Sequence, residues 1–171
     1  MMSDGALAGG ERDEFRRALD LALRWLGARA RTERELRERL RQKGVPPGVV
    51  EATLERVRQW GYLDDRSFAV DYVDRALAVR HIGPRRLVEE LRRRGISGSL
   101  ASEVVAERVP PERVLNLARA AAQRWLRRQP EGDPVSARGR LYRFLTARGF
   151  DSETAARVVR EHLGEDEAGA P

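Results

Sequence analysis

The sequence of 171 residues contains no cysteine, which excludes disulfide bonds, thiolate nucleophiles and zinc sites built on cysteine. It contains two histidines, His81 and His162, and neither has a second ligand at a metal-binding spacing. The sequence also lacks any run of about 20 apolar residues, the length of a membrane-spanning helix. Its start has neither the basic nor the apolar region of a signal peptide. We therefore expect a cytoplasmic protein that is not bound to a membrane.

Motifs of catalysis are missing as well. Gly95-Ile96-Ser97-Gly98 has neither the glycine spacing nor the lysine of a P-loop, and no Gly-x-Ser-x-Gly elbow occurs. Asp71 and Asp74 lie close together in the sequence, but a solvated helix face accounts for them better than a cation site. We predict a binding protein rather than an enzyme, with no catalytic residue, no cofactor and no metal.

Aromatic residues make up only 6% of the chain, whereas charged residues make up 35%. Lysine and arginine (33) outnumber aspartate and glutamate (27), for a net charge of +6, and Lys43 is the only lysine. An arginine-rich genome would explain the preference for arginine over lysine. The positive net charge is a separate observation, and it favours an acidic partner, either nucleic acid or an acidic protein surface.

The hydrophobic pattern is helical and repeats three times along the chain. Gly44, Gly95 and Gly149 mark equivalent positions, 51 and 54 residues apart. Leucines stand eight and four residues before each of these glycines: Leu36 and Leu40, Leu87 and Leu91, Leu141 and Leu145. A basic residue precedes each glycine and an apolar residue follows it, as at the end of a helix. Each unit therefore predicts two helices, a glycine turn and a third helix.

These units predict an all-α protein of three tandem three-helix repeats. The expected helices span 12–29, 32–43, 47–60, 65–80, 84–94, 98–108, 111–128, 135–148 and 152–163. Repeats this short cannot bury their apolar faces alone, so we expect them to stack into an elongated curved array. The expected limits are a disordered N-terminus at 1–10, repeats at 11–62, 63–109 and 110–163, and an acidic disordered tail at 164–171. We expect a monomer.

The stretch between the first and second repeats contains strong signals for a helix end and a new helix start. Gly61 favours the end of a helix, and Asp64 or Asp65 can cap the next one. We assign the apolar residues of this stretch to the fold rather than to a partner surface: Tyr62, Leu63, Phe68 and Tyr72.

The segment from Arg80 to Arg94 carries the strongest local charge. It holds six arginines against Glu89 and Glu90, an excess of +4. Pairs four residues apart would make an ordinary solvated helix, but they cannot cancel this excess, which attracts polyanions. A second basic cluster, at residues 29–41, is diluted by three glutamates. Few aromatic residues accompany either cluster, which argues against a base-stacking platform.

The stretch Gly61–Arg75 and its continuation resemble the signature of the RecX family of bacterial regulatory proteins. The residues that carry the resemblance are Gly61-Tyr62-Leu63-Asp64-Asp65, Phe68-Ala69, Tyr72, Arg75, Gly83, Leu87, Leu91 and Arg94-Gly95-Ile96. The resemblance extends over about residues 21–163 and implies three tandem three-helix repeats, in agreement with the periodicity.

The resemblance also implies a function that the periodicity does not show. RecX-family proteins bind the RecA recombinase, which forms filaments on single-stranded DNA, and they inhibit its ATP hydrolysis, strand exchange and coprotease activity. This implies a regulator of recombination, DNA repair and the SOS response, with the RecA filament as its partner. The alternative is a direct DNA-binding helical module, whose target is single- or double-stranded DNA. Our candidate contact residues are Arg75, Arg80, His81, Arg85, Arg86, Arg92, Arg93 and Arg94.

Overall fold

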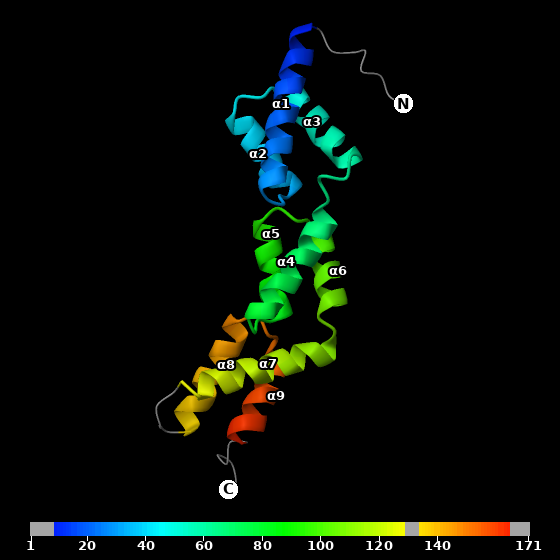
Figure 1. Ribbon diagram of the computed structural model, residues 1–171. Coiled ribbons are helices and arrows are strands. Elements are labelled where there is room, and N and C mark those ends of the chain that lie inside the picture. The colour runs from blue at the N-terminus through cyan, green and yellow to red at the C-terminus, as the bar shows by residue number, and fades with distance from the viewer. Residues whose placement is uncertain (1–8, 129–133, 165–171) are drawn as a thin grey trace. The chain divides into compact units, whose positions relative to one another are not determined.

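The computed structural model describes residues 9–128 and 134–164, and within these ranges the chain forms nine helices and no strand (Figure 1). In chain order they are α1 (Gly9–Ala28), α2 (Glu33–Gln42), α3 (Pro47–Gln59), α4 (Asp65–Val79), α5 (Pro84–Arg93), α6 (Gly98–Arg108), α7 (Pro111–Leu126), α8 (Pro134–Ala147) and α9 (Ser152–Leu163). The all-α class and the predicted helices are confirmed. The largest displacement is at α1, which begins at Gly9 rather than at residue 12.

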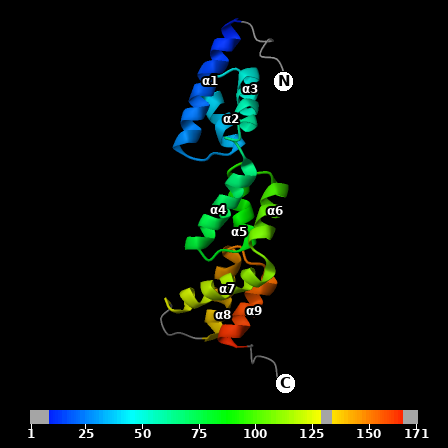
Figure 2. The same cartoon turned by 45° about the vertical axis from the view of Figure 1, so that its right-hand side comes forward.

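The predicted disordered ends fall mostly outside the described residues, and the limits that we gave for the repeats stay predictions. The chain divides into two compact units, Met1–Ala69 with Arg93–Ile96 and Val70–Arg92 with Ser97–Pro171. In the first unit α1, α2 and α3 pack against one another, and in the second α7, α8 and α9 do so (Figures 1 and 2).

The leucines of the repeat pattern form the centre of the fold. All six have no exposed surface: Leu36, Leu40, Leu87, Leu91, Leu141 and Leu145. In the first unit Leu36 and Leu40 pack among Ala22, Val50 and Leu54, and in the second unit the leucines of α8 pack against alanines of α7 and valines of α9. Burying such a side chain stabilises the fold by about 1.5–3 kcal/mol. The apolar spacing read from the sequence therefore identifies the core.

The three glycines that define the repeats adopt the left-handed conformation, with φ of 76° at Gly44, 98° at Gly95 and 90° at Gly149. Two of them also permit a close approach between helices. A Cβ atom on Gly95 would lie 2.4 Å from the Cβ atom of Arg34, and one on Gly149 would lie 2.4 Å from the main-chain nitrogen of Arg86. Each of these turns thus receives the start of an earlier helix, α2 in the first unit and α5 in the second.

Hydrogen bonds to the main chain hold both of these contacts. In the first unit the hydroxyl of Thr32 donates to the carbonyl of Arg94 (2.6 Å). In the second unit the main-chain N–H of Gly83 donates to the carbonyl of Arg148 (2.9 Å). Thr32 and Gly83 stand at equivalent places in the repeat, 51 residues apart. The same joint is therefore built twice, once with a side-chain donor and once with the backbone.

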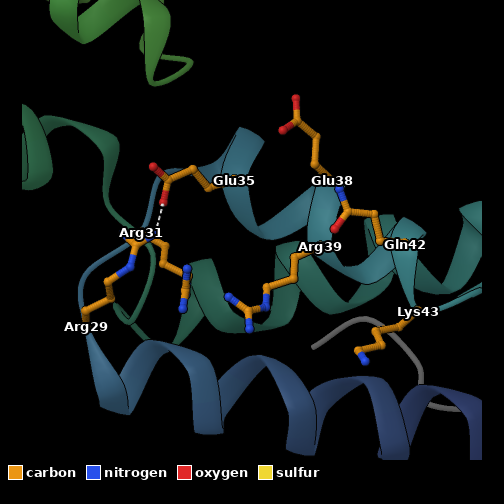
Figure 3. Close-up of a pocket in the computed structure, with 7 residues that line it drawn as sticks. All are labelled: Arg29, Arg31, Glu35, Glu38, Arg39, Gln42 and Lys43. Carbon is orange, nitrogen blue, oxygen red and sulfur yellow. Dashed lines mark ion pairs between the residues drawn. The ribbon is translucent and has the colours of Figure 1, made fainter.

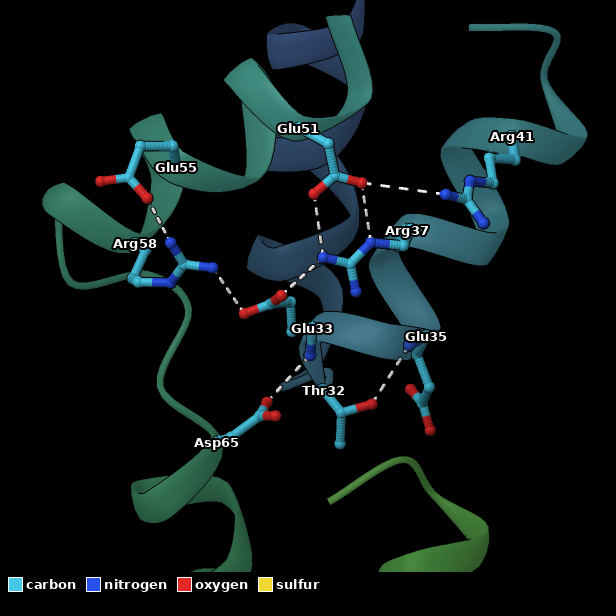
Figure 4. Close-up of polar contacts among 9 residues, drawn as sticks. All are labelled: Thr32, Glu33, Glu35, Arg37, Arg41, Glu51, Glu55, Arg58 and Asp65. Carbon is cyan, nitrogen blue, oxygen red and sulfur yellow. Dashed lines mark hydrogen bonds and ion pairs between the residues drawn. The ribbon is translucent and has the colours of Figure 1, made fainter. Parts of the chain in front are cut away.

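The two aspartates at the start of α4 have different partners. Asp64 Oδ1 accepts hydrogen bonds from the main-chain N–H groups of Arg66 (2.9 Å) and Ser67 (3.0 Å), so Asp64 caps α4. Asp65 instead accepts a hydrogen bond from the main-chain N–H of Glu33 (2.9 Å), at the start of α2 (Figure 4). Burial raises the pKa of Asp65, and this hydrogen bond acts in the opposite direction. Of the two candidate caps, one serves α4 and the other serves α2.

The assignment of Tyr62 to the fold is wrong for its side chain, which is 60% exposed. Its main-chain N–H closes the end of α3 on the carbonyl of Val57 (2.9 Å), and this geometry leaves the ring in solvent. Leu63 and Phe68 are buried, as predicted. Tyr72 is half-buried, because its hydroxyl must reach a glutamate on α5. Sequence spacing alone did not distinguish the buried ring of Phe68 from the exposed ring of Tyr62, which follows the end of α3.

Candidate functional site

The predicted contact residues fall in both units. Arg93 and Arg94 belong to the first unit, and the other six belong to the second: Arg75, Arg80, His81, Arg85, Arg86 and Arg92. Arg80 and His81 are half-buried, whereas the remaining arginines are exposed. The predicted set is therefore divided between the two units.

Glu90 organises the predicted residues that do come together. Its carboxylate, only 12% exposed, accepts hydrogen bonds from Arg80 Nη2 (2.7 Å), Arg86 Nε (3.0 Å) and the hydroxyl of Tyr72 (2.7 Å). Burial opposes ionisation of this carboxyl, but the three hydrogen bonds outweigh burial and lower the pKa of Glu90 to about 2. Glu90 therefore stays ionised and fixes the positions of two cationic side chains.

Three arginines that the sequence did not single out lie beside this group. Burial lowers the pKa of Arg148, and the charges of Arg124, Arg86, Arg128 and Arg80 lower it further. These four charges therefore each act on the guanidinium of Arg148. We call Arg80, Arg86, Arg124, Arg128 and Arg148, with Glu90, the Arg148 surface.

A small pocket of about 100 Å³ opens within the Arg148 surface. Its lining combines cationic and aromatic side chains: His81, Ala121, Arg124, Trp125, Arg128, Phe144 and Arg148. The guanidinium of Arg148 lies 4.8 Å from the ring centre of Phe144, and its Nη1 donates to the carbonyl of His81 (3.4 Å). Nδ1 of His81 is buried and has no hydrogen-bond partner among the described residues. This arrangement suits an anionic group.

Charge in the Arg148 surface is far from balanced. Glu90 is the one carboxylate paired with these five arginines in the ranges that the structure describes, and it engages only Arg80 and Arg86. The sequence contained two signals for the missing arginines. Arg124 lies in the last turn of α7, Arg128 follows four residues later, just beyond the end of that helix, and Arg148 is the basic residue before the third repeat glycine. Neither signal shows that the packing of α7 on α8 joins them.

The other predicted residues of the second unit have separate surroundings. Arg75 Nε donates to the carbonyl of Asp71 (3.1 Å) within α4. The main-chain N–H of Arg85 donates to the carbonyl of Gly149 (3.2 Å). Hydrogen bonds from Thr154 lower the pKa of Asp151, and the nearby charge of Arg85 lowers it further.

In the first unit, Arg93 and Arg94 accept hydrogen bonds through their main-chain carbonyl groups. The carbonyl of Arg93 accepts a hydrogen bond from Arg34, and that of Arg94 accepts one from Thr32. These bonds belong to the joint at Gly95 described above. The positions of Arg93 and Arg94 are therefore explained by the fold, and their exposed side chains stay candidates for contact.

The second basic cluster is neutralised in part, whereas Arg31 and Arg39 form no ion pair among the described residues. Glu33 accepts hydrogen bonds from Arg37 Nη2 (2.6 Å) and Arg58 Nη2 (2.6 Å), while Arg37 Nε donates to Glu51 (2.9 Å) (Figure 4). Arg58 also pairs with Glu55. We call this set, with Arg41 and Asp65, the Glu33 network: Glu33, Arg37, Arg41, Glu51, Glu55, Arg58 and Asp65. It joins α2 to α3 and to the start of α4.

Among the described residues, no group of three or more histidine, aspartate or glutamate side chains could hold a metal ion. None of the described helices combines the length and the apolar character that crossing a membrane requires.

Comparisons with known proteins agree on one family along the whole helical region. The family model described as the first three-helix domain of RecX matches residues 18–56, the second matches 64–105 and the third matches 112–159. A regulatory protein RecX of Deinococcus radiodurans is 37% identical over 161 residues, which is 92% of this chain and 76% of that protein. One of Prosthecochloris aestuarii is 33% identical over 152 residues, covering 88% of this chain and 96% of its own.

Solved structures show the same fold. The crystal structure of RecX from Lactobacillus salivarius has a TM-score of 0.80 at 17% identity and covers 88% of this chain and 97% of its own. A crystal structure of a regulatory protein RecX has a TM-score of 0.79 at 24% identity, covering 95% of this chain and 82% of its own. At these identities the likeness concerns the fold alone.

Proposed function

The chain belongs to the RecX family of regulatory proteins, and from this membership we propose that it binds the RecA filament on single-stranded DNA. Binding inhibits the ATP hydrolysis, strand exchange and coprotease activity of the recombinase, without any catalysis by this chain. The protein acts in the cytoplasm as a monomer. The family resemblance names the partner, and the charge of the Arg148 surface supports an acidic one.

The Arg148 surface is the observation that carries the proposed contact. The surface has five guanidinium groups and one carboxylate, which pairs with two of them. Some of the guanidinium N–H donors therefore have no acceptor among the described residues. An acidic protein groove would satisfy them, and complementary charge would speed the encounter. The half-buried carboxylate of Glu90 holds two of the donors in place before the partner arrives, which lowers the entropy that binding loses.

Direct DNA binding is the second candidate, and the pocket of the Arg148 surface favours it. Trp125 and Phe144 line this pocket beside Arg124 and Arg148. Aromatic rings next to guanidinium groups are typical of sites for single-stranded nucleic acid.

One experiment separates these two functions. RecA ATP hydrolysis is measured at saturating single-stranded DNA while the protein is added from far below one copy per recombinase monomer. A filament regulator inhibits under these conditions, and assembled filaments retain it in a pull-down more strongly than bare DNA. Inhibition that disappears with excess DNA, together with equal retention on bare DNA, would favour the DNA-binding module instead.

A further inference from the structure

A second cationic hollow lies in the first unit, between the end of α1 and α2 (Figure 3). Its volume is about 490 Å³, and its lining residues are Arg29, Arg31, Glu35, Glu38, Arg39, Gln42 and Lys43. All of them belong to the first unit, whereas the residues of the Arg148 surface belong to the second.

Arg31 lies at the bottom of this hollow with only 8% of its surface exposed. A buried guanidinium is normally paired with a carboxylate. Arg31 Nε donates to the carbonyl of Trp25 (3.3 Å), but Arg31 forms no ion pair in the described part of the chain. Of the two carboxylates of the hollow, Glu38 pairs with a second arginine outside it, and Glu35 pairs with Arg29 (3.0 Å) while its charge also favours the charged form of Arg31.

Arg39 brings a second guanidinium to the same place. It lies 4.7 Å from the ring centre of Trp25, the residue whose carbonyl Arg31 contacts. Figure 3 shows the side chains of Arg31 and Arg39 extending into one hollow. Burial lowers the pKa of Arg31, and the charges of Arg29 and Arg39 lower it further. Two unpaired guanidinium groups side by side repel each other unless an anion lies between them.

We propose that this hollow binds a phosphate group, held between the guanidinium groups of Arg31 and Arg39. Two planar forks offer more N–H donors than the two oxygens of a carboxylate accept, whereas a phosphate has further oxygens to receive them. Lys43 adds a third positive charge at the rim, and it forms no ion pair among the described residues. The hollow has room for a phosphate that is part of a nucleotide or of a nucleic acid strand.

The test uses the full chain and nitrogen-15 NMR spectra that resolve the arginine Nε–H and tryptophan indole signals. Inorganic phosphate, thymidine monophosphate, a ten-residue oligothymidylate and a ten-residue oligoglutamate are titrated separately at low salt. We expect the phosphate-bearing probes to shift the signals of Arg31, Arg39 and Trp25. Tighter binding of the oligothymidylate would identify a strand as the source of the phosphate, and equal binding of the monophosphate would identify a free nucleotide.

Arg39→Gln removes one fork and should weaken the binding of these probes at this site about tenfold, as the loss of a charge-assisted contact does. Arg41→Gln is the matched control, because Arg41 lies on the same helix, outside the hollow, and its loss should change binding less than about twofold. If Arg39→Gln did not fold, Lys43→Gln would take its place, with an expected loss of about threefold.

Three results would overturn the proposal. One is the absence of any shift at Arg31 and Arg39 with every phosphate probe, and another is a loss of affinity in Arg41→Gln equal to that in Arg39→Gln. The third is tighter binding of oligoglutamate than of any phosphate probe, which would make the hollow a site for an acidic peptide. No recombinase is present, so these results leave the proposed function unaffected.

Discussion

Each unit holds a partly buried glutamate between arginines, but the charges around the two glutamates differ. Glu33 belongs to a network in which four carboxylates meet three guanidinium groups. Glu90 is the one carboxylate paired with the Arg148 surface, where five guanidinium groups meet in the described part of the second unit.

The two glutamates lie on equivalent helices, α2 and α5, each with its leucines fully buried. The fold requires the apolar faces of these helices to be buried and their polar faces to be held by paired side chains. The Glu33 network provides this pairing with nearly equal numbers of carboxylates and guanidinium groups. The excess of the Arg148 surface is therefore not required by the repeat, and we attribute it to a partner. The comparison indicates that the Glu33 network serves the fold alone, whereas the Arg148 surface carries a charge excess beyond what the fold uses.

The largest expected effect on stability concerns the fully buried leucines, which α2 and α5 share. Leu40→Ala in α2 and Leu91→Ala in α5 each remove a fully buried side chain. Each should lower the free energy of unfolding by about 2–5 kcal/mol, through lost burial and the cavity left behind. Urea unfolding measures both. A cost within experimental error for either variant would mean that the two helices are not equivalent.

Acid should weaken the fold through Glu90. Its pKa in the folded protein, about 2, lies below its ordinary value of 4.5, so ionised Glu90 stabilises the fold at neutral pH. The contribution, about 2–3 kcal/mol, is complete above about pH 5 and is lost as the pH falls toward 2.

The measurement is the free energy of unfolding of the wild type and of Glu90→Gln between pH 6 and pH 3. The difference between the two should shrink as the pH falls. A difference that stays constant over this range would show that the Glu90 carboxylate does not depend on its arginines as we describe.

Neutralising Glu33 should unlink α2 from α3. Glu33→Gln leaves Arg37 and Arg58 without their shared carboxylate, and we expect unfolding to cost about 1–2 kcal/mol less. Glu38→Gln serves as control, because Glu38 is 60% exposed and has a single long ion pair (3.6 Å). If Glu38→Gln destabilised the protein as much as Glu33→Gln, the Glu33 network would have no special role.

The smallest expected effect is a gain in stability rather than a loss. Arg124→Gln removes one of the charges that crowd Arg148, so it should leave the stability unchanged or raise it by up to about 0.5 kcal/mol. Added salt should remove the gain, because screening weakens the repulsion among the arginines. A clear loss of stability in thermal unfolding would mean that Arg124 has a structural partner.

The sequence predicted the features that depend on local spacing. The glycine turns, the buried leucines and the cap at Asp64 follow from the periods of helices and the conformations open to glycine. The hydrogen bond from Glu33 to Asp65 could not be predicted, because the sequence around each residue already has the pattern of an ordinary helix cap.

The Arg148 surface was predicted only in part for a related reason. Arg80 and Arg86 stand near Glu90 in the sequence, whereas Arg124 and Arg148 join this surface through the packing of helices in the second unit. A count of charge along the chain does not show which arginines converge. It also did not separate the Glu33 network from the cationic hollow at Arg31, which both use side chains of α2.

The central claim is that the charge of the Arg148 surface, rather than net charge, holds the partner. The direct test is the affinity of wild type, Arg124→Glu and Arg140→Glu for assembled RecA filaments at increasing salt, with melting curves as the folding control. Both arginines are exposed on helices of the second unit, and neither forms an ion pair among the described residues. We predict that Arg124→Glu weakens binding about tenfold or more at low salt and that Arg140→Glu weakens it less than about threefold. Equal affinities of the two folded variants would contradict the claim.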